Sequence, residues 1–473
     1  MKLKYIVLGG CIAGASLTSC TKSDLFKTPQ NAIPADQAYT TPARIELASV
    51  GMYDALQNSN FFGGRVLVYA DIRGLDAIPS SYFGNMGFYS STNSSDGTVA
   101  SAYQGAYRTI YQTNLFQQGF APNAGLVSPD KANQYVGEAK FIRSLCYFYL
   151  VNLWAQPYTF TADASHPGVP LVLSVVKNAF DSSNYLPRST VKQVYDQIEA
   201  DLLEAETKLP DPPADPFTSV ARANKGSARA MLMRLYLYKG DWARANQYAD
   251  KVVAMNIYGL NINNPMAAFR PPYTTAESIF SVAMSGADNP NTNNSLGQHY
   301  GPRARGDISI STDFINLMDT TVDRRYRAFG GDSLMERYKG GYWTRKYTGL
   351  TTDFVPVMRY AEVLLTKAEA LAKLANGTVD ANAVSLVNQI RTRANAAPIA
   401  PLTQQDLINL IIRERRIELA FEGQGSLEFE RNKMDLPAHS TVPLQGWGSN
   451  YRVLPIPKYD TDKNPNLKQN DGY

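Results

Sequence analysis

The sequence has few of the residues that build metal centres, disulfide frameworks or acid–base sites. Its 473 residues include only three histidines (His166, His299, His439) and three cysteines (Cys11, Cys20, Cys146). No histidine or cysteine has the spacing of a zinc motif, and neither a nucleotide-binding loop nor a nucleophile elbow is present. These absences argue against an enzyme, and the sequence predicts no cofactor and no metal site.

A strong excess of charge of either sign is also missing. The chain has 46 Lys and Arg residues against 42 Asp and Glu residues, a formal net charge of +4. Nucleic-acid-binding proteins need a basic surface, so we expect no nucleic-acid partner. After the N-terminus, no segment has the roughly 20 consecutive apolar residues of a membrane-spanning helix.

The N-terminus has the layout of an export signal. Lys2 and Lys4 precede the apolar run 5–15, which is too short to span a bilayer. Residues 17–20, with the sequence LTSC, resemble the lipobox of bacterial lipoproteins, in which the cysteine is acylated. The alternative is an ordinary signal peptide with an incidental cysteine, but Cys20 stands where cleavage is expected. We therefore expect a signal peptide over residues 1–19 and a lipid anchor on Cys20.

Helical periodicity dominates the rest of the chain. Apolar residues recur every three or four positions between Thr190 and Lys208, which predicts a helix with one buried face. The segment 130–154 is apolar nearly all round in its second half, so this helix is expected at the centre of the core. Further helices are expected near 43–57, 99–119, 225–239, 241–256, 357–375, 379–394 and 404–422.

Two of these predicted helices resemble a tetratricopeptide unit. The segments 225–239 and 241–256 turn at Gly240, and Ala245 and Ala249 allow a close approach that Trp242 fills. A clean repeat of about 34 residues is not visible elsewhere. The sequence therefore predicts an all-α fold. Tetratricopeptide-like helix pairs form a superhelical body, with long irregular loops and at most a few short strands.

The loops between these helices are long and rich in aromatic residues. The segments 74–97, 288–306 and 337–352 combine Ser, Asn and Gly with tyrosines and Trp343. Tyrosine and tryptophan suit both core packing and ligand stacking. Loops of this length in a helical protein are commonly functional or disordered, and their aromatic rings favour the functional interpretation.

Four segments, in order along the chain, resemble the SusD/RagB family of nutrient-binding outer-membrane lipoproteins. They are residues 137–154, beginning GEAKFIR; 357–370, beginning VMRYAEVLL; 412–423, IRERRIELAFEG; and 454–473, with LPIP followed by NPNLKQNDGY. The stretch 424–431 departs from the family pattern. Gly425 stands where an arginine is common and Glu428 replaces an aspartate, which puts one local salt bridge in doubt.

The resemblance implies a function and a domain organisation. We expect an N-terminal SusD-like region over 20–215, and over 216–473 a helix-pair unit followed by a C-terminal SusD/RagB-like region. The resemblance implies a lipid-anchored protein on the outside of the outer membrane. There it would capture an oligosaccharide and deliver it to a SusC-like TonB-dependent transporter. A peptide-binding member of the same scaffold and a helical scaffold protein without a small ligand remain alternatives.

Acidic residues on two predicted helices could be interpreted as a catalytic site. Glu362 and Glu369 lie seven residues apart, and Glu414, Glu418 and Glu422 repeat every four residues beside arginines. A glycosidase uses such a pair of carboxylates. We interpret them instead as ion pairs that fix helix packing, because they lie within helix signatures rather than on loops around a cleft.

The candidate ligand-binding residues lie in or beside the long loops. Aromatic rings would stack on sugar faces, and charged or polar groups would bond the hydroxyls. For any single loop aromatic, packing onto the helical body is at least an equal alternative. The predicted ligand-binding set is Tyr82, Tyr89, Tyr300 and Trp343, with Arg303 and Asp71 as polar partners.

Overall fold

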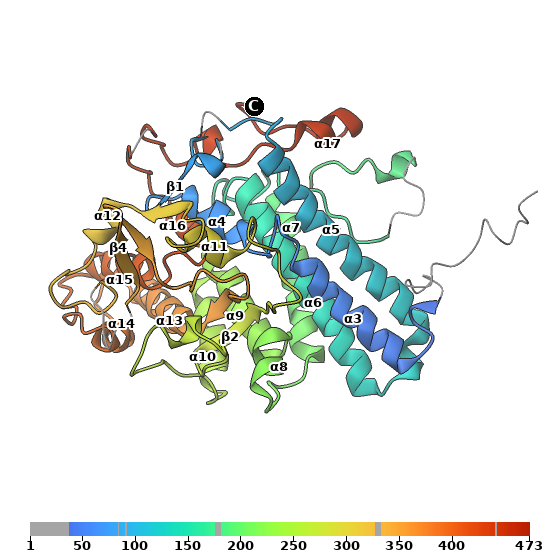
Figure 1. Ribbon diagram of the computed structural model, residues 1–473, viewed down its shortest axis with the longest axis horizontal. Helices are drawn as coiled ribbons and strands as arrows, with labels where there is room; N and C mark the ends of the chain where they lie inside the picture. Colours follow the sequence, from blue (N-terminus) through green and yellow to red (C-terminus); the bar gives the residue numbers. More distant parts are fainter. Residues whose placement is uncertain (1–36, 84, 90–91, 176–180, 327–332, 440–441) are drawn as a thin grey trace, which may run out of the picture.

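The computed structural model describes residues 37–473 except 84, 90–91, 176–180, 327–332 and 440–441. The signal peptide and Cys20 lie outside the described residues. Helices form the body of the molecule, with a few short strands and long loops between them (Figure 1). This architecture confirms the predicted all-α fold.

One group of helices packs around a buried central helix. α3 (Pro42–Leu56), α5 (Gly97–Phe120) and α6 (Pro129–Trp154) lie side by side, and α7 (Val191–Lys208) packs on α6. Ser128 caps α6, and Pro129 occupies its first turn, where a missing N–H costs nothing. The second half of α6 is buried almost completely, Cys146 included. This confirms the expected central position of the helix.

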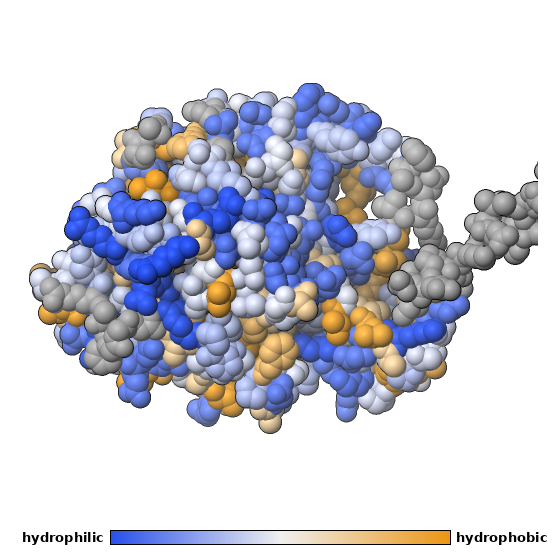
Figure 2. Space-filling model, in the orientation of Figure 1, coloured by the Kyte–Doolittle hydropathy of each residue, from blue (hydrophilic) through white to orange (hydrophobic). Residues whose placement is uncertain are grey.

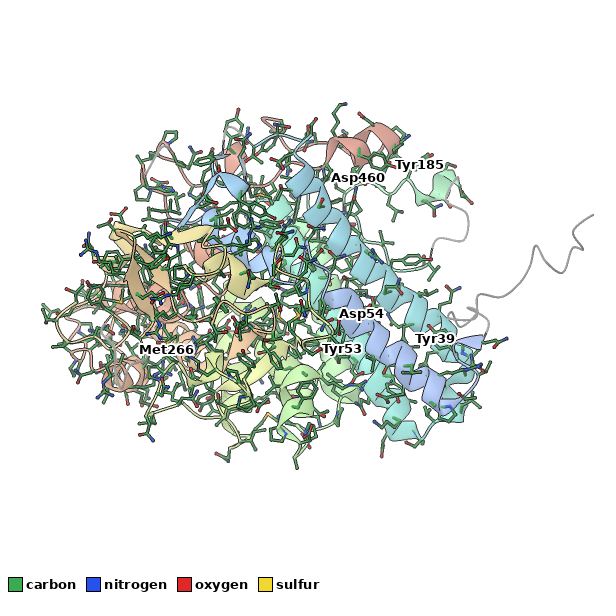
Figure 3. The ribbon with its side chains drawn as sticks, in the orientation of Figure 1. Tyr39, Tyr53, Asp54, Tyr185, Met266 and Asp460 are labelled. Carbon is green, nitrogen blue, oxygen red and sulfur yellow. The ribbon has the colours of Figure 1, made fainter. Side chains whose placement is uncertain are left out.

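Tyr39 shows how the first described residues join this group. Its ring meets Phe116 on α5 edge-on at 5.9 Å, and its hydroxyl donates to the carbonyl of Leu115 (Figure 3). A Cβ at Gly119 would overlap the Tyr39 ring, so glycine allows this contact. The N-terminal end of the described chain is thus fastened to the helical body.

The second group consists of helix pairs. α9 (Lys225–Lys239) and α10 (Trp242–Val253) turn through Gly240, whose φ of +72° suits glycine. Ala245 and Ala249 are fully buried, as expected for a close crossing. α10 packs on α13 (Tyr360–Leu374), which also contacts α14 (Ala381–Arg393) and α15 (Gln404–Glu418). The predicted tetratricopeptide-like pairing is confirmed.

Short elements fill the loops. The strands form three antiparallel pairs: β1 (Ala77–Pro79) with β3 (Ile308–Ile310), β2 (Ser278–Val282) with β6 (Val355–Arg359), and β4 (Met335–Tyr338) with β5 (Gly341–Thr344). The remaining α-helices are α4 (Arg65–Ile72), α8 (Pro216–Ala221), α11 (Leu296–Tyr300), α12 (Thr312–Ile315), α16 (Gly425–Arg431) and α17 (Lys458–Lys463). Short 3₁₀ turns are η3 (Ser81–Phe83), η5 (Ala121–Leu126), η6 (Ser182–Asn184), η7 (Ala267–Phe269) and η8 (Asn450–Arg452).

One predicted helix begins later than expected. The helix expected over 357–375 begins at Tyr360, because residues 355–359 form β6 and pair with β2. Hydrogen bonds to a strand distant in sequence therefore override the local helical pattern in these residues.

The five glutamates that the sequence places near arginines, two on α13, two on α15 and Glu422 just after α15, are buried in ion pairs. Each of the five has a basic partner within 2.7 Å: Glu362 with Arg234, Glu369 with Arg431, Glu414 with Arg391, Glu418 with Arg393, and Glu422 with Arg359. These pairs confirm the structural interpretation of the carboxylates, since charges in the interior need such partners. Glu428 likewise forms ion pairs with Arg415 at 2.9 Å and with Arg431 at 2.5 Å. The local salt bridge that the sequence put in doubt is therefore present.

The main hydrophobic core runs from Ile45 to Leu467 and draws on both sides of residue 215. The division into regions 20–215 and 216–473 stays a prediction. Across the part of the chain that the structure describes, no helix has both the length and the apolar character needed to cross a membrane.

Candidate functional site

Three loop segments far apart in the sequence meet at one face of the molecule. β1 pairs with β3, so that Ala77 lies opposite Ile310 and Pro79 opposite Ile308. Next to this pair, the Ser80 amide donates to the carbonyl of Asp307 at 2.7 Å. β3 also packs against β5, and Figure 1 shows β1, β4, α11 and α12 gathered at one end of the molecule. We call this surface the loop face.

Tyr82 is an exposed aromatic ring on the loop face, and its surroundings hold it rigidly. The residue is 40% exposed, and its hydroxyl donates to the carbonyl of Asn293 at 2.9 Å. The guanidinium of Arg305 lies 4.0 Å from the ring centroid and that of Arg65 lies 5.5 Å from it. Arg305 also pairs with Asp307 at 2.7 Å. We call Arg65, Tyr82, Asn293, Arg305 and Asp307 the tyrosine–arginine cluster.

A second feature of the loop face is a cleft of about 570 Å³. Its charged lining residues are Arg270, Arg303, Arg345 and Glu336, and the rest of its wall comes from residues 301–304 and 344–349. Arg303, whose side chain is 71% exposed, pairs with Glu336 at 3.2 Å. We call this feature the arginine cleft. The turn 301–306 joins it to the tyrosine–arginine cluster, because the turn carries both Arg303 and Arg305.

Trp343 lies on the β4–β5 hairpin beside the arginine cleft. It is half-buried on β5, opposite Glu336, and the ring of Tyr338 meets it edge-on at 6.1 Å. Among the described residues its indole N–H has no hydrogen-bond partner. Arg303 lies 5.5 Å from the centroid of the Tyr338 ring. The predicted residues Tyr82, Arg303 and Trp343 are therefore brought to the same face.

The other three predicted ligand residues, Tyr89, Tyr300 and Asp71, are buried in the interior and present no side chain on the loop face, which corrects their choice as ligand contacts. Tyr300 is 1% exposed and donates a 2.7 Å hydrogen bond to Asp71, which is 2% exposed. Asp71 also accepts from the amides of Gly423 and Gly425. Tyr89 is buried, with its hydroxyl bonded to the Arg73 carbonyl and the Arg73 guanidinium 4.6 Å from its ring centroid.

Burial changes the chemistry of Asp71. It raises the pKa of the carboxyl to about 7, against the lowering effect of the hydrogen bonds from Tyr300, Gly423 and Gly425. A group bonded in this way holds α4, α11 and α16 together. Its role in the structure is to support the loop face from behind.

Several site residues were missed by sequence reasoning. Arg65 lies on α4 and Arg270 next to η7, both outside the three long loops. Arg305 lies two positions after the predicted Arg303, and this closeness in sequence is the one feature that could have pointed to it. Asn293 lies in a predicted loop but offers a backbone carbonyl to Tyr82, a contact that residue type does not reveal.

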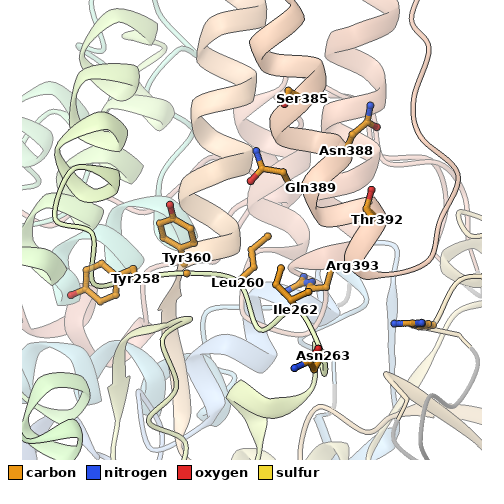
Figure 4. Close-up of a pocket in the computed structure, with 12 residues that line it drawn as sticks. Tyr258, Leu260, Ile262, Asn263, Tyr360, Ser385, Asn388, Gln389, Thr392 and Arg393 are labelled. Carbon is orange, nitrogen blue, oxygen red and sulfur yellow. The ribbon is translucent and has the colours of Figure 1, made fainter.

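A larger cleft of about 900 Å³ lies elsewhere, between α14 and the segment 258–263 (Figure 4). Its lining includes Tyr258, Tyr360, Asn263, Arg324 and Arg393, and on α14 the polar residues Ser385, Asn388, Gln389 and Thr392. These four positions form the outward face of an amphipathic helix, an ordinary location for polar side chains. The cleft includes none of the predicted ligand residues, so the loop face is the candidate site.

Comparisons with known proteins agree with this architecture. The family described as "Starch-binding associating with outer membrane" matches residues 27–237, and the SusD family matches residues 319–473. SusD-like protein P2 of Formosa agariphila is 26% identical and covers 100% of this chain and 99% of its own. The starch-binding protein SusD of Bacteroides thetaiotaomicron is 25% identical over 71% of this chain and 72% of its own.

Solved structures show the same fold. A SusD superfamily protein from Bacteroides fragilis superimposes with a TM-score of 0.80 at 29% identity, covering 91% of this chain and 100% of that chain. A putative sugar binding protein from Bacteroides vulgatus gives 0.79 at 24% identity, covering 92% and 99%. With matches in both halves and over nearly the whole fold, the chain belongs to the SusD/RagB family of nutrient-binding proteins associated with the outer membrane.

Proposed function

We propose that this protein captures an oligosaccharide at the loop face and delivers it to a SusC-like TonB-dependent transporter. The observation that carries the proposal is that Tyr82, Arg303 and Trp343, from three separate segments, lie on one face of the molecule, where Arg303 lines the arginine cleft. A ligand there meets an aromatic edge, guanidinium donors and backbone carbonyls together, as sugar recognition requires. The names of the relatives, starch-binding and sugar-binding proteins among them, support the same ligand class.

We further propose that Cys20 carries lipid and holds the protein on the exterior of the outer membrane. This proposal rests on the lipobox-like sequence LTSC at residues 17–20 and on the match to a family described as associating with the outer membrane. The body could then close over the mouth of a transporter while remaining attached to the membrane.

The binding site is tested by calorimetry with a panel of oligosaccharides and with alanine variants. We expect Tyr82→Ala or Trp343→Ala to weaken binding about tenfold or less, because an aromatic contact contributes on the order of 1 kcal/mol. The double variant should nearly abolish binding. Tyr459→Ala is the matched control, since Tyr459 is 64% exposed on α17, outside the loop face. Circular dichroism checks that each variant is folded.

The outcomes separate the alternatives. Parent-like binding by the folded double variant would place the ligand elsewhere. Binding of peptides with no oligosaccharide binding would favour a peptide-binding member of the scaffold, and binding of neither would favour a scaffold protein. Co-purification of a TonB-dependent transporter from detergent extracts tests the partner.

We also propose that the captured oligosaccharide is released unchanged. The carboxylates that would be the candidates for glycosidic cleavage, Glu362 and Glu418 among them, are buried in ion pairs with arginines. Mass spectrometry of the ligand after prolonged incubation should return the intact oligomer. Turnover that a Glu362→Gln or Glu418→Gln substitution removes would contradict this proposal.

A further inference from the structure

The larger cleft, between α14 and the segment 258–263, differs in its charged lining from the loop face. Figure 2 shows strongly hydrophilic residues clustered over β4 and the loops beside it, where the arginine cleft lies. Among the described residues that line the larger cleft, none is acidic, and five have uncharged amide or hydroxyl side chains: Asn263, Ser385, Asn388, Gln389 and Thr392. We call this feature the amide cleft.

The two arginines that line the amide cleft are engaged within the protein. Arg393 pairs with Glu277 at 2.8 Å through Nη1 and with Glu418 at 2.5 Å through Nη2, so its guanidinium is already occupied. Arg324 also has a partner within the protein. Neither of these two arginines is therefore a free cation that an anionic ligand could use.

The uncharged side chains of the amide cleft, in contrast, have unused hydrogen-bonding groups. Ser385, Gln389 and Thr392 form no side-chain hydrogen bond to another described residue. Asn388 accepts a 2.8 Å bond from a main-chain amide through Oδ1, and this bond orients its NH₂ group. An exposed glutamine on α15, Gln405, instead bonds a neighbour on its own helix at 2.9 Å. The wall formed by α14 thus offers neutral donors and acceptors that the protein itself does not use.

The four polar residues of α14 form one row along the helix. Positions 385, 388, 389 and 392 follow each other at helical spacing, so they share one face. The row is about 10 Å long, because each residue of a helix adds about 1.5 Å. A polar row that faces only solvent would be ordinary. This row faces Tyr258 and Tyr360 across the cleft, so polar groups and aromatic rings line opposite walls (Figure 4).

The segment 258–263, which forms the opposite wall, is held in place before any ligand arrives. The Asn261 amide donates to the Glu277 carboxylate at 3.0 Å. The Tyr258 hydroxyl is buried, and a Cβ at Gly226 would overlap it, so the start of α9 fixes the position of this ring. A wall that is already ordered loses little conformational freedom on binding, which favours affinity.

We propose that the amide cleft binds a neutral oligosaccharide, at a second site separate from the loop face. Its volume of about 900 Å³ lies within the range of small-molecule sites. A sugar hydroxyl both donates and accepts hydrogen bonds, which matches the amide and hydroxyl side chains of α14. The C–H face of a sugar ring packs on an aromatic ring such as Tyr360.

A bound peptide is the alternative occupant. An extended peptide pairs with a regular edge of main-chain groups, whereas the polar groups of the α14 wall are side chains spread over two helical turns. This difference favours the oligosaccharide. The inference goes beyond the proposed function and does not depend on ligand binding at the loop face.

The test uses protein that carries Tyr82→Ala and Trp343→Ala, so that the loop face does not contribute. Saturation-transfer NMR at millimolar ligand measures the binding of maltohexaose, cellohexaose, laminarihexaose and xylohexaose. We expect at least one of them to bind with a dissociation constant on the order of 1 mM, which is too weak to register in the calorimetry of the loop face.

Adding Gln389→Ala and Thr392→Ala should weaken that binding about tenfold or more, because two hydrogen bonds to the ligand are lost. Alanine is a good helix former, so α14 should stay folded, and circular dichroism checks this. Gln104→Ala is the matched control and should leave the binding unchanged, since Gln104 is exposed on α5 and lines neither cleft.

Three results would overturn the inference. The first is no signal from any of the four hexasaccharides, and the second is a signal that Gln389→Ala with Thr392→Ala leaves unchanged. The third is cleft-dependent binding of an acetylated and amidated hexapeptide of alternating serine and alanine with no hexasaccharide binding, which would identify a peptide site.

The same variants keep the inference and the proposed function apart. Oligosaccharide binding that Tyr82→Ala with Trp343→Ala removes completely would support the loop face and overturn the amide cleft. Binding that only the α14 variants reduce would support the amide cleft and overturn the loop face. Binding of no oligosaccharide by the parent protein would overturn both.

Discussion

Tyr300 donates a 2.7 Å hydrogen bond to Asp71, 229 positions earlier in the chain, and both side chains are buried. Through this bond α11 is fastened to α4, and the amides of Gly423 and Gly425 add the start of α16 to the same carboxylate. The loops that bear Tyr82 and Arg303 are thus packed on helices that hydrogen bonds hold together. A rigid support of this kind keeps a binding site in shape before its ligand arrives.

Tyr300→Phe should lower the free energy of unfolding by about 1–2 kcal/mol and leave ligand affinity unchanged. The ring still fills its place, but a buried hydrogen bond to Asp71 is lost. Urea unfolding followed by circular dichroism measures the first effect and calorimetry the second. Tyr459→Phe, at an exposed position on α17, should change neither. A clear loss of affinity in folded Tyr300→Phe would contradict the assignment of this residue to support alone.

Gly425→Ala should destabilise the protein by about 1–3 kcal/mol, because it overpacks a tight contact. A Cβ at this position would lie 2.9 Å from the Cα of Asp71. Gly97→Ala is the control: Gly97 also begins a helix, α5, and a Cβ there meets nothing within 4 Å. Equal thermal unfolding midpoints for the two variants would show that close packing at Gly425 is unimportant.

Acid should weaken the protein through Glu428. Burial alone would raise the pKa of this carboxyl, but Arg415 and Arg431 outweigh it and bring the pKa to about 2. The unfolded chain has a value near 4.5, so the stabilisation is complete above pH 4.5 and is lost as the pH falls toward 2. The expected loss from this group is on the order of 3 kcal/mol, measured by urea unfolding at a series of pH values.

The Glu428→Gln variant provides the contrast for this pH dependence. It should be less stable at neutral pH, because two buried guanidiniums lose their shared carboxylate. Its unfolding free energy should also fall less steeply between pH 4.5 and 2. An unchanged slope would assign the acid sensitivity to other groups.

Cys20→Ala should move the protein from the membrane fraction to the soluble fraction. A lipid-modified cysteine anchors a protein firmly when it carries more than one acyl chain, and alanine can carry none. Fractionation after a high-salt wash, with Cys146→Ala as the control for a buried cysteine, measures the effect. Full membrane retention of Cys20→Ala in cells that lack the transporter would contradict the anchor.

The sequence by itself determined the helical architecture and the family. Helix ends depend on local signals, such as the caps Ser128 and Thr190 and the turn at Gly240, so residue type and spacing alone predict them. The same holds for the buried face of each amphipathic helix and for the ion-pair interpretation of Glu362 and Glu418. These features depend on contacts within one helix or on the low tolerance of the interior for unpaired charge.

Only the tertiary structure decided which loop residues face solvent. Tyr82 and Tyr89 stand in similar loop sequence, yet one ring lies on the surface and the other packs against Arg73 in the interior. The grouping of Arg270, Arg303 and Arg345 was equally invisible, because it depends on pairings between segments tens to hundreds of residues apart. The exposure of a loop residue depends on which distant segments of the chain pack against it. Residue type and periodicity do not reveal which segments these are.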